Sequence, residues 1–142
     1  MPYRYLDDIA TADVAFLATG TSLEELFSAA GDALMNVMVA DLAAILRRDT
    51  VTVDLEETDL DLLLFSFLQE LIYYKDARQL LLRTSRITIT EVDGTHLRAI
   101  LSGERIDPLR HKLDVDVKAV TLYRFRVEKV GEGWEAQVIL DI

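Results

Sequence analysis

Apolar residues recur at every third or fourth position in two stretches of the chain, which is the spacing of one buried helix face. The first helix is predicted to begin at Ser22, because a serine followed three residues later by Glu25 is the pattern of a capping box. The second begins after Asp59, where early carboxylates favour the positive end of the helix dipole, and ends near Lys75. The two predicted apolar stripes are Leu23, Leu26, Phe27, Ala30, Leu34, Val37 and Met38, and then Leu60, Leu63, Leu64, Phe67, Leu68, Leu71 and Ile72.

Alternating apolar and polar residues predict strands in much of the remaining chain. Asp93-Gly94 separates two such stretches and is typical of the two-residue turn of a β-hairpin. The alternation over residues 115–130 predicts either one long strand or two strands joined by a bend. The predicted strands cover residues 13–19, 50–55, 86–92, 95–102, 115–130 and 134–142.

The order of these elements is β-α-β-α followed by an antiparallel series of strands. This order indicates an α+β fold: a two-layer sandwich with a mostly antiparallel sheet of about six strands and two main helices on one face. We expect one domain over residues 1–142, since no linker or repeat divides the chain. Apolar strand edges could pair between chains, so a homo-oligomer stays open.

Composition indicates a globular protein in a reducing compartment. Residues of the hydrophobic class make up 51% of the chain, and there is no cysteine, which excludes disulfides and zinc–thiolate sites. The longest apolar run is far shorter than the ~20 residues of a membrane helix. The N-terminal residues lack the apolar segment of a secretory signal. We therefore expect a cytoplasmic location and no membrane association.

The chain carries a net charge of −10, from 25 acidic and 15 basic residues. A phosphate backbone repels an acidic protein, so we expect no direct binding to nucleic acid. Any connection to RNA would then depend on a protein partner or on a metal. The simpler alternative is that the excess charge only keeps the protein soluble.

The common catalytic motifs are missing from the sequence. There is no glycine-rich phosphate loop, no His-Glu-x-x-His pair and no nucleophile elbow, so the chain is poorly equipped to be an enzyme by itself. His111 follows Asp107-Pro108 in a predicted loop, where it is either a ligand or contact residue or an ordinary surface histidine. His96 adjoins the hairpin turn and is expected to face solvent.

Acidic groups at the two ends of the chain suggest a cation site. The last strand ends at Asp141-Ile142, which places a carboxylate, a carbonyl oxygen and the terminal carboxylate together, and Asp13 directly precedes the first strand. Such oxygen ligands suit hard cations. The alternatives are that Asp13 only closes a turn and that Asp141 is solvated. Lys118 would either be solvated or balance these carboxylates or bind a phosphate.

Six short stretches together resemble the archease family, in the same order and over nearly the whole chain. They are Thr11-Ala12-Asp13, Ser22-Leu23-Glu24-Glu25, Ser66-Phe67-Leu68-Gln69-Glu70-Leu71, Gly103-Glu104, Val117-Lys118-Ala119-Val120-Thr121 and Asp141-Ile142. The resemblance implies a non-enzymatic activator of the RtcB-type RNA ligase, which joins RNA halves in tRNA splicing and RNA repair. Such an activator promotes guanylylation of the ligase and its multiple turnover.

The resemblance also implies a divalent-cation site at Asp13, Asp141 and Ile142, described for the family as calcium-binding, with Mg²⁺ and Mn²⁺ open. This sequence departs from the family pattern at Ala10 and Tyr123, where archeases commonly have histidines. The oxygen ligands remain, which favours Ca²⁺ or Mg²⁺ over zinc.

Two other functions stay open. One is a chaperone or modulator of RNA-modifying enzymes, such as a tRNA methyltransferase, with a purely structural cation. The other is a small metal-dependent hydrolase, which would need Glu70, Glu104 or His111 as its general base.

Overall fold

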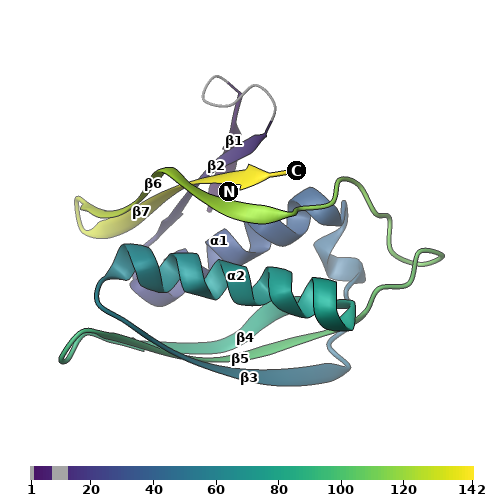
Figure 1. Ribbon diagram of the computed structural model, residues 1–142, viewed down its shortest axis with the longest axis horizontal. Coiled ribbons are helices and arrows are strands. Elements are labelled where there is room, and N and C mark those ends of the chain that lie inside the picture. The colour runs from purple at the N-terminus through teal and green to yellow at the C-terminus, as the bar shows by residue number, and fades with distance from the viewer. Residues whose placement is uncertain (1, 8–12) are drawn as a thin grey trace.

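The computed structural model describes residues 2–7 and 13–142, and in these ranges two α-helices lie between two β-sheets (Figure 1). A short 3-10 helix at Leu42–Ala44 follows the first α-helix. The elements are β1 (Tyr3–Leu6), β2 (Val14–Gly20), α1 (Leu23–Met38), β3 (Asp49–Glu57), α2 (Leu60–Arg78), β4 (Leu80–Thr90), β5 (Thr95–Arg105), β6 (Ala119–Val130) and β7 (Gly133–Asp141).

Both sheets are antiparallel. One has four strands in the order β1-β2-β7-β6, and the other has three in the order β3-β5-β4. The α+β class predicted from the sequence is confirmed. The predicted single sheet of about six strands with both helices on one face was wrong, because the strands divide into two sheets that enclose the helices.

The composition of α2 explains this third layer. A helix with one apolar stripe can cover only one sheet, whereas a helix that is apolar on several sides is buried between layers. The buried side chains of α2 form one broad face, and the half-buried Phe65 on a further side contacts Phe125 of β6, so α2 packs against β6 as well as against β3, β4 and β5. Helix α1 approaches α2 closely at Gly31. A Cβ added at this glycine would lie only 3.3 Å from the Leu71 side chain.

The local signals in the sequence are mostly confirmed. The Ser22 side chain accepts a hydrogen bond from the Glu25 N–H and begins α1. Asp93 and Gly94 lie in the predicted hairpin with φ angles of 55° and 96°, but β4 already ends at Thr90, so the connection to β5 is longer than the predicted two-residue turn. Helix α2 runs past its expected end to Arg78, and Gln79 terminates it in the left-handed conformation. Strand β4 follows immediately, six residues earlier than predicted.

The segment 115–130 contains one strand, β6, which begins at Ala119. Its pairing with β7 is interrupted by a register shift between Thr121 and Arg126, and Arg124 there has a φ of 54°. This irregularity is the bend that the sequence left open. No helix in the described ranges is both long and apolar enough to cross a lipid bilayer.

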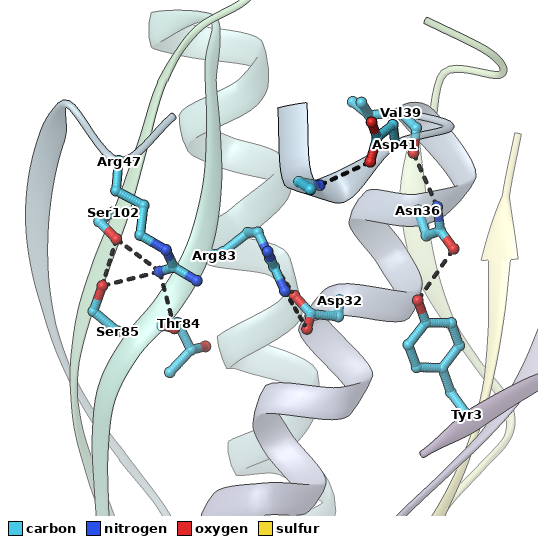
Figure 2. Close-up of polar contacts among 11 residues, drawn as sticks. Tyr3, Asp32, Asn36, Val39, Asp41, Arg47, Arg83, Thr84, Ser85 and Ser102 are labelled. Carbon is cyan, nitrogen blue, oxygen red and sulfur yellow. Dashed lines mark hydrogen bonds and ion pairs between the residues drawn. The ribbon is translucent and has the colours of Figure 1, made fainter. Parts of the chain in front are cut away.

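Polar contacts attach the outer elements to α1 (Figure 2). The Tyr3 hydroxyl of β1 donates to Asn36 Oδ1 at 3.1 Å, and the Asn36 side-chain amide donates to the Val39 carbonyl at the end of α1. On the opposite side, the Arg83 guanidinium of β4 donates two hydrogen bonds of 3.0 Å to the Asp32 carboxylate. These bonds hold both sheets against the same helix.

Candidate metal centre

The pairing of β2 with β7 brings the two predicted carboxylates to one corner of the four-stranded sheet. Val14 of β2 pairs with Leu140 of β7, and Asp13 and Asp141 are the next residues on their chains. Asp13 lies one residue before β2, so the two stand opposite each other only if this register continues for one residue past the end of the strand. Side chains at opposite positions of an antiparallel pair have Cβ atoms about 4.5–5.5 Å apart. One ion can bridge carboxylates at that separation.

Burial indicates the direction in which this corner faces. Leu140 is fully buried against the helices, and successive residues of a strand face opposite sides of the sheet. The side chain of Asp141 is therefore directed away from the helix layer, and it is exposed, whereas Asp13 is half-buried. Ile142 packs against the core, which holds the backbone oxygens next to Asp141 in place.

A 360 Å³ pocket adjoins Asp13 and adds two carboxylates that the sequence did not indicate. Asp7 and Asp114 line it together with Asp13, although the three are widely separated in the sequence. The remaining lining residues come from β1, β2, the end of α1 and the loop before β6. They are Tyr5, Leu6, Val14, Ala15, Asn36, Val37 and Val115.

Among the described residues, no three histidine, cysteine or acidic side chains come together as a metal-binding group. A cation at this corner would therefore depend on two carboxylates, on backbone oxygens and on water. Ca²⁺ accepts six to eight oxygen ligands in flexible geometry, so this donor set fits it better than it fits zinc.

Lys118 adjoins Asp141, one of the two predicted carboxylate residues. Its backbone N–H donates a 2.8 Å hydrogen bond to the Asp141 carbonyl. Its side chain is exposed. The ammonium group is thus free to meet a charged group that approaches this corner.

A buried lysine of α2 anchors the segment that leads to Lys118. Lys75 is only 6% exposed, and its ammonium group donates to the Asp116 carboxylate at 2.6 Å and to the Val117 carbonyl at 2.7 Å. Burial alone would lower the pKa of Lys75, but the hydrogen bonds and charges of Asp116 and Asp76 outweigh it and raise that pKa above its usual value. The corner is therefore tied to α2 by a charged group.

His111, which the sequence suggested as a contact residue or a surface histidine, has no exposed side-chain surface. Its Nδ1 accepts a hydrogen bond from the Asp107 N–H at 2.9 Å, so the ring proton lies on Nε2. Nε2 donates to the Glu104 carboxylate at 2.9 Å. Both ring nitrogens are thus used inside the protein, and a contact with a partner is contradicted for this conformation. The residue instead fixes the loop that follows β5.

Glu104 is the centre of that internal network. The residue is 4% exposed, and its carboxylate accepts a 2.6 Å hydrogen bond from the Leu46 N–H and pairs with the Arg110 guanidinium. The hydrogen bond from Arg110 is the main cause that lowers the pKa of Glu104 to about 2, against desolvation, which would raise it. Such buried pairing is also why Glu104 is unavailable as a general base.

This lowered pKa predicts a specific loss of stability in acid. Glu104 contributes stability that is complete above its unfolded pKa, near 4.5, and that is lost as pH falls toward about 2. We expect the urea midpoint of the wild type to fall faster between pH 5 and pH 2.5 than that of Glu104→Gln, which lacks this titration. Parallel pH profiles of the two proteins would contradict the assignment.

The two family histidine positions differ in what the structure describes. Ala10 lies outside the described residues, as do Thr11 and Ala12 of the first resemblance stretch. Tyr123 lies in the irregular part of β6, is 63% exposed, and has the Arg124 guanidinium 5.4 Å from its ring centroid.

Comparison with known sequences gives a consistent result. The family model described as the archease protein family (MTH1598/TM1083) matches residues 3–142. A curated archease of Methanosarcina acetivorans is 36% identical over 142 residues, covering 99% of this chain and 95% of that protein. The archease of Archaeoglobus fulgidus is 35% identical over the full length of both chains, and that of Pyrococcus furiosus is 36% identical over 134 residues, with 93% and 94% covered.

Two solved structures resemble the fold. The solution structure of protein 1598 from Methanobacterium thermoautotrophicum has a TM-score of 0.86 and 31% identity, and 99% of each chain is covered. The crystal structure of a Thermotoga maritima archease, described as a possible chaperone, has a TM-score of 0.66 over 94% of this chain and 93% of that one. Its 19% identity supports the likeness of the fold alone.

Proposed function

Because this chain belongs to the archease family, we propose that it is a non-enzymatic, metal-binding activator of an RtcB-type RNA ligase in tRNA splicing and RNA repair. It would promote guanylylation of the ligase and its multiple turnover. The observation that carries this proposal is the end of the β2–β7 ladder at Val14 and Leu140. Asp13 directly precedes Val14, and Asp141 directly follows Leu140.

The proposed role of this corner is to hold one divalent cation, Ca²⁺ in the first place, with Mg²⁺ or Mn²⁺ as alternatives. Asp13, Asp141 and the backbone oxygens of Ile142 would be its protein ligands. Like charges at opposite positions of a sheet repel one another, so a cation between the two carboxylates relieves an existing cost. Lys118, which is exposed and whose backbone N–H bonds to Asp141, would face the phosphates of the bound nucleotide or balance the carboxylates.

Cation binding can be tested without the ligase. We expect Ca²⁺ to raise the melting temperature of the wild type. At a Ca²⁺ concentration a hundredfold above Kd, the free energy of unfolding should increase by about 2.7 kcal/mol. Asp13→Asn and Asp141→Asn should lose this shift, yet melt no lower than the wild type in a chelator, because each removes a repulsive charge. Asp93→Asn is the matched control, since asparagine tolerates the left-handed conformation of that turn.

Activation is tested with the ligase itself. Under limiting ligase with GTP and Mn²⁺, the wild type and Asp93→Asn should both increase guanylylation and turnover. Asp13→Asn and Asp141→Asn should give little increase. If both corner variants stimulate as well as the wild type, the corner plays no part in activation.

The competing function is a chaperone or modulator of RNA-modifying enzymes, such as a tRNA methyltransferase, with a structural cation. The description of the Thermotoga maritima protein as a possible chaperone motivates it. Stable binding and protection of a methyltransferase from aggregation, without any effect on the ligase, would favour this alternative.

A further inference from the structure

Strand β3 is an open sheet edge that no other strand of the described chain covers. It forms the outer strand of the three-stranded sheet and pairs with β5 in unbroken register from Asp49 to Glu57. Figure 1 shows it at the margin of the molecule, below α2. An edge strand presents backbone N–H and C=O groups that can pair with another chain. Nine residues without proline or bulge are a long edge of this kind.

The long edges of the other strands are blocked by side chains or irregularities. On β6, Asp61 accepts the Val127 N–H at 3.2 Å, and Gln69 accepts the Val120 N–H at 3.3 Å. Both blocking side chains belong to α2, and the register shift within β6 interrupts that edge further. Strand β1 is only four residues long.

Strand β4 is blocked in the same manner. The Glu24 carboxylate of α1 accepts the Ile89 N–H at 3.1 Å. A register shift follows Thr84, and the Arg47 guanidinium donates to the Thr84 carbonyl at 3.2 Å (Figure 2). By contrast, within the described ranges no side chain bonds to the backbone of residues 49–56. Among the long edge strands of the described chain, β3 is therefore the one whose outer backbone groups are left available for pairing.

A cavity of about 540 Å³ lies along this edge, between β3 and the exposed side of α2. Its apolar surfaces come from Leu55, Phe65 and Tyr73, and Tyr73 is 56% exposed. Ser66, Gln69 and Glu70 complete the lining, and Glu70 is its single charged group. Glu70 makes no ion pair with another residue that the structure describes. A strand added beside β3 would direct every second side chain into this space.

Charge selects the occupant. Strand β3 carries Asp49, Asp54, Glu56 and Glu57 and no basic residue. Asp54 has a partner, Arg98, at 3.6 Å, and Glu57 accepts a hydrogen bond from Ser66. A second copy of this chain would bring two acidic strands of a protein with net charge −10 together, which like-charge repulsion opposes.

A lysine or arginine side chain matches both the apolar surface of the cavity and its single acidic group. Its aliphatic part can cover Phe65 and Tyr73, where the cation also gains from the aromatic faces, and its charged end can pair with Glu70. A second cavity of about 630 Å³ borders the other end of β3 and contains balanced charges, Asp49 and Asp76 with Arg78 and Arg105. The requirement for a basic side chain thus applies at the Leu55 end.

We propose that the β3 edge, together with the cavity between it and α2, is a docking site for an extended basic segment of a partner protein, which pairs with β3 as an additional strand. Main-chain hydrogen bonds supply affinity in this mode, and pockets for alternate side chains supply specificity. The site belongs to the three-stranded sheet and does not depend on the metal centre, so its test needs neither ligase nor cation.

The probe is a fluorescein-labelled nine-residue peptide of alternating lysine and valine, with blocked ends. We expect it to bind the wild type and to shift and protect the backbone amides of residues 50–56 in NMR spectra. Two further peptides carry N-methyl groups on alternate amides, in the two possible phases, so that charge is kept and backbone donors are lost. We expect one phase to abolish binding and the other to be tolerated, because a strand uses alternate amides toward each side.

Charge-reversal variants locate the site independently. Glu70→Lys should weaken binding of the unmethylated peptide by about tenfold or more, a loss of about 1.4 kcal/mol. Glu132→Lys, in the turn between β6 and β7, changes the net charge equally and should leave binding unchanged within about twofold.

Several results would overturn the proposal. They are no binding of the alternating peptide, equal binding of all three peptides, equal weakening by Glu132→Lys, and amide shifts centred away from β3. Equal binding of the methylated peptides would mean attraction by charge alone, and that measurement uses the wild type, so it does not depend on how the variants fold.

Discussion

Gly103→Ala is expected to prevent the chain from reaching a stable fold. A Cβ at this position would lie 1.7 Å from the Leu81 carbonyl oxygen and 2.8 Å from its carbonyl carbon. Both atoms belong to the backbone of β4, which pairs with β5 at Leu82 and Gly103. No side-chain rotation relieves such a contact, so the two strands must separate. We expect a loss above about 4 kcal/mol, in the exceptional range for single substitutions.

Urea denaturation followed by circular dichroism measures this loss. A domain of this kind has roughly 5–15 kcal/mol of stability in total, so the variant should be unfolded or close to its midpoint in buffer. Gly131→Ala is the matched control, because its φ of 60° strains alanine although no atom lies within 4 Å of the added Cβ. That control should lose only about 1–2 kcal/mol. Equal midpoints for the two variants would show that β4 moves aside without cost.

Glu104→Ala is expected to give the second large loss, of about 3–5 kcal/mol, because it leaves buried partners of a charged network without their acceptor. The carboxylate accepts from the Leu46 N–H and from His111, both at 3 Å or less, and pairs with Arg110. Without it, the Leu46 N–H and the buried His111 ring lose their acceptor, and the partly exposed Arg110 guanidinium loses its ion-pair partner. Thermal unfolding at pH 7 measures the loss.

Two variants separate the parts of this network. Glu104→Gln keeps an oxygen acceptor but loses the charge, so its stability should lie between those of the wild type and Glu104→Ala. Arg48→Ala removes a partner that is 3.7 Å from the carboxylate and largely exposed, and should cost under about 1 kcal/mol. If Arg48→Ala costs as much as Glu104→Ala, the buried donors contribute less than we infer.

Sequence patterns predicted the individual elements because each depends on a few neighbouring residues. Ser22 caps α1 and Asp93-Gly94 turns the hairpin through local hydrogen bonds and φ angles, which the residue types determine. The division into two sheets depends instead on which strands pair across long stretches of chain. Leu80–Leu82 form a short apolar run after α2 that has no alternation to mark it as the start of β4. Periodicity therefore could not assign it.

The residues of the candidate site were likewise predicted from the sequence only in part. Asp13 and Asp141 were proposed as neighbours because both flank strand ends, and the β2–β7 ladder ends one residue short of them, at Val14 and Leu140. Asp7 and Asp114 were missed because only the folded chain brings them beside Asp13. His111 was predicted to be either a ligand or contact residue or a surface histidine. Its burial was missed because its acceptor, Glu104, lies in another element, β5, and no local pattern relates the two residues.

The position of β7 has a consequence for how the protein is made on the ribosome. This strand is synthesised last, yet it lies inside the four-stranded sheet, between β2 near the N-terminus and β6. During translation β2 can pair with β1 but has no neighbour on its other side until β7 is synthesised. Helix α1 and the β3-β5-β4 sheet are complete earlier and can already pack. Asp141 belongs to β7, so a prematurely terminated chain that lacks this strand would also lack one of the two carboxylates of the proposed metal centre.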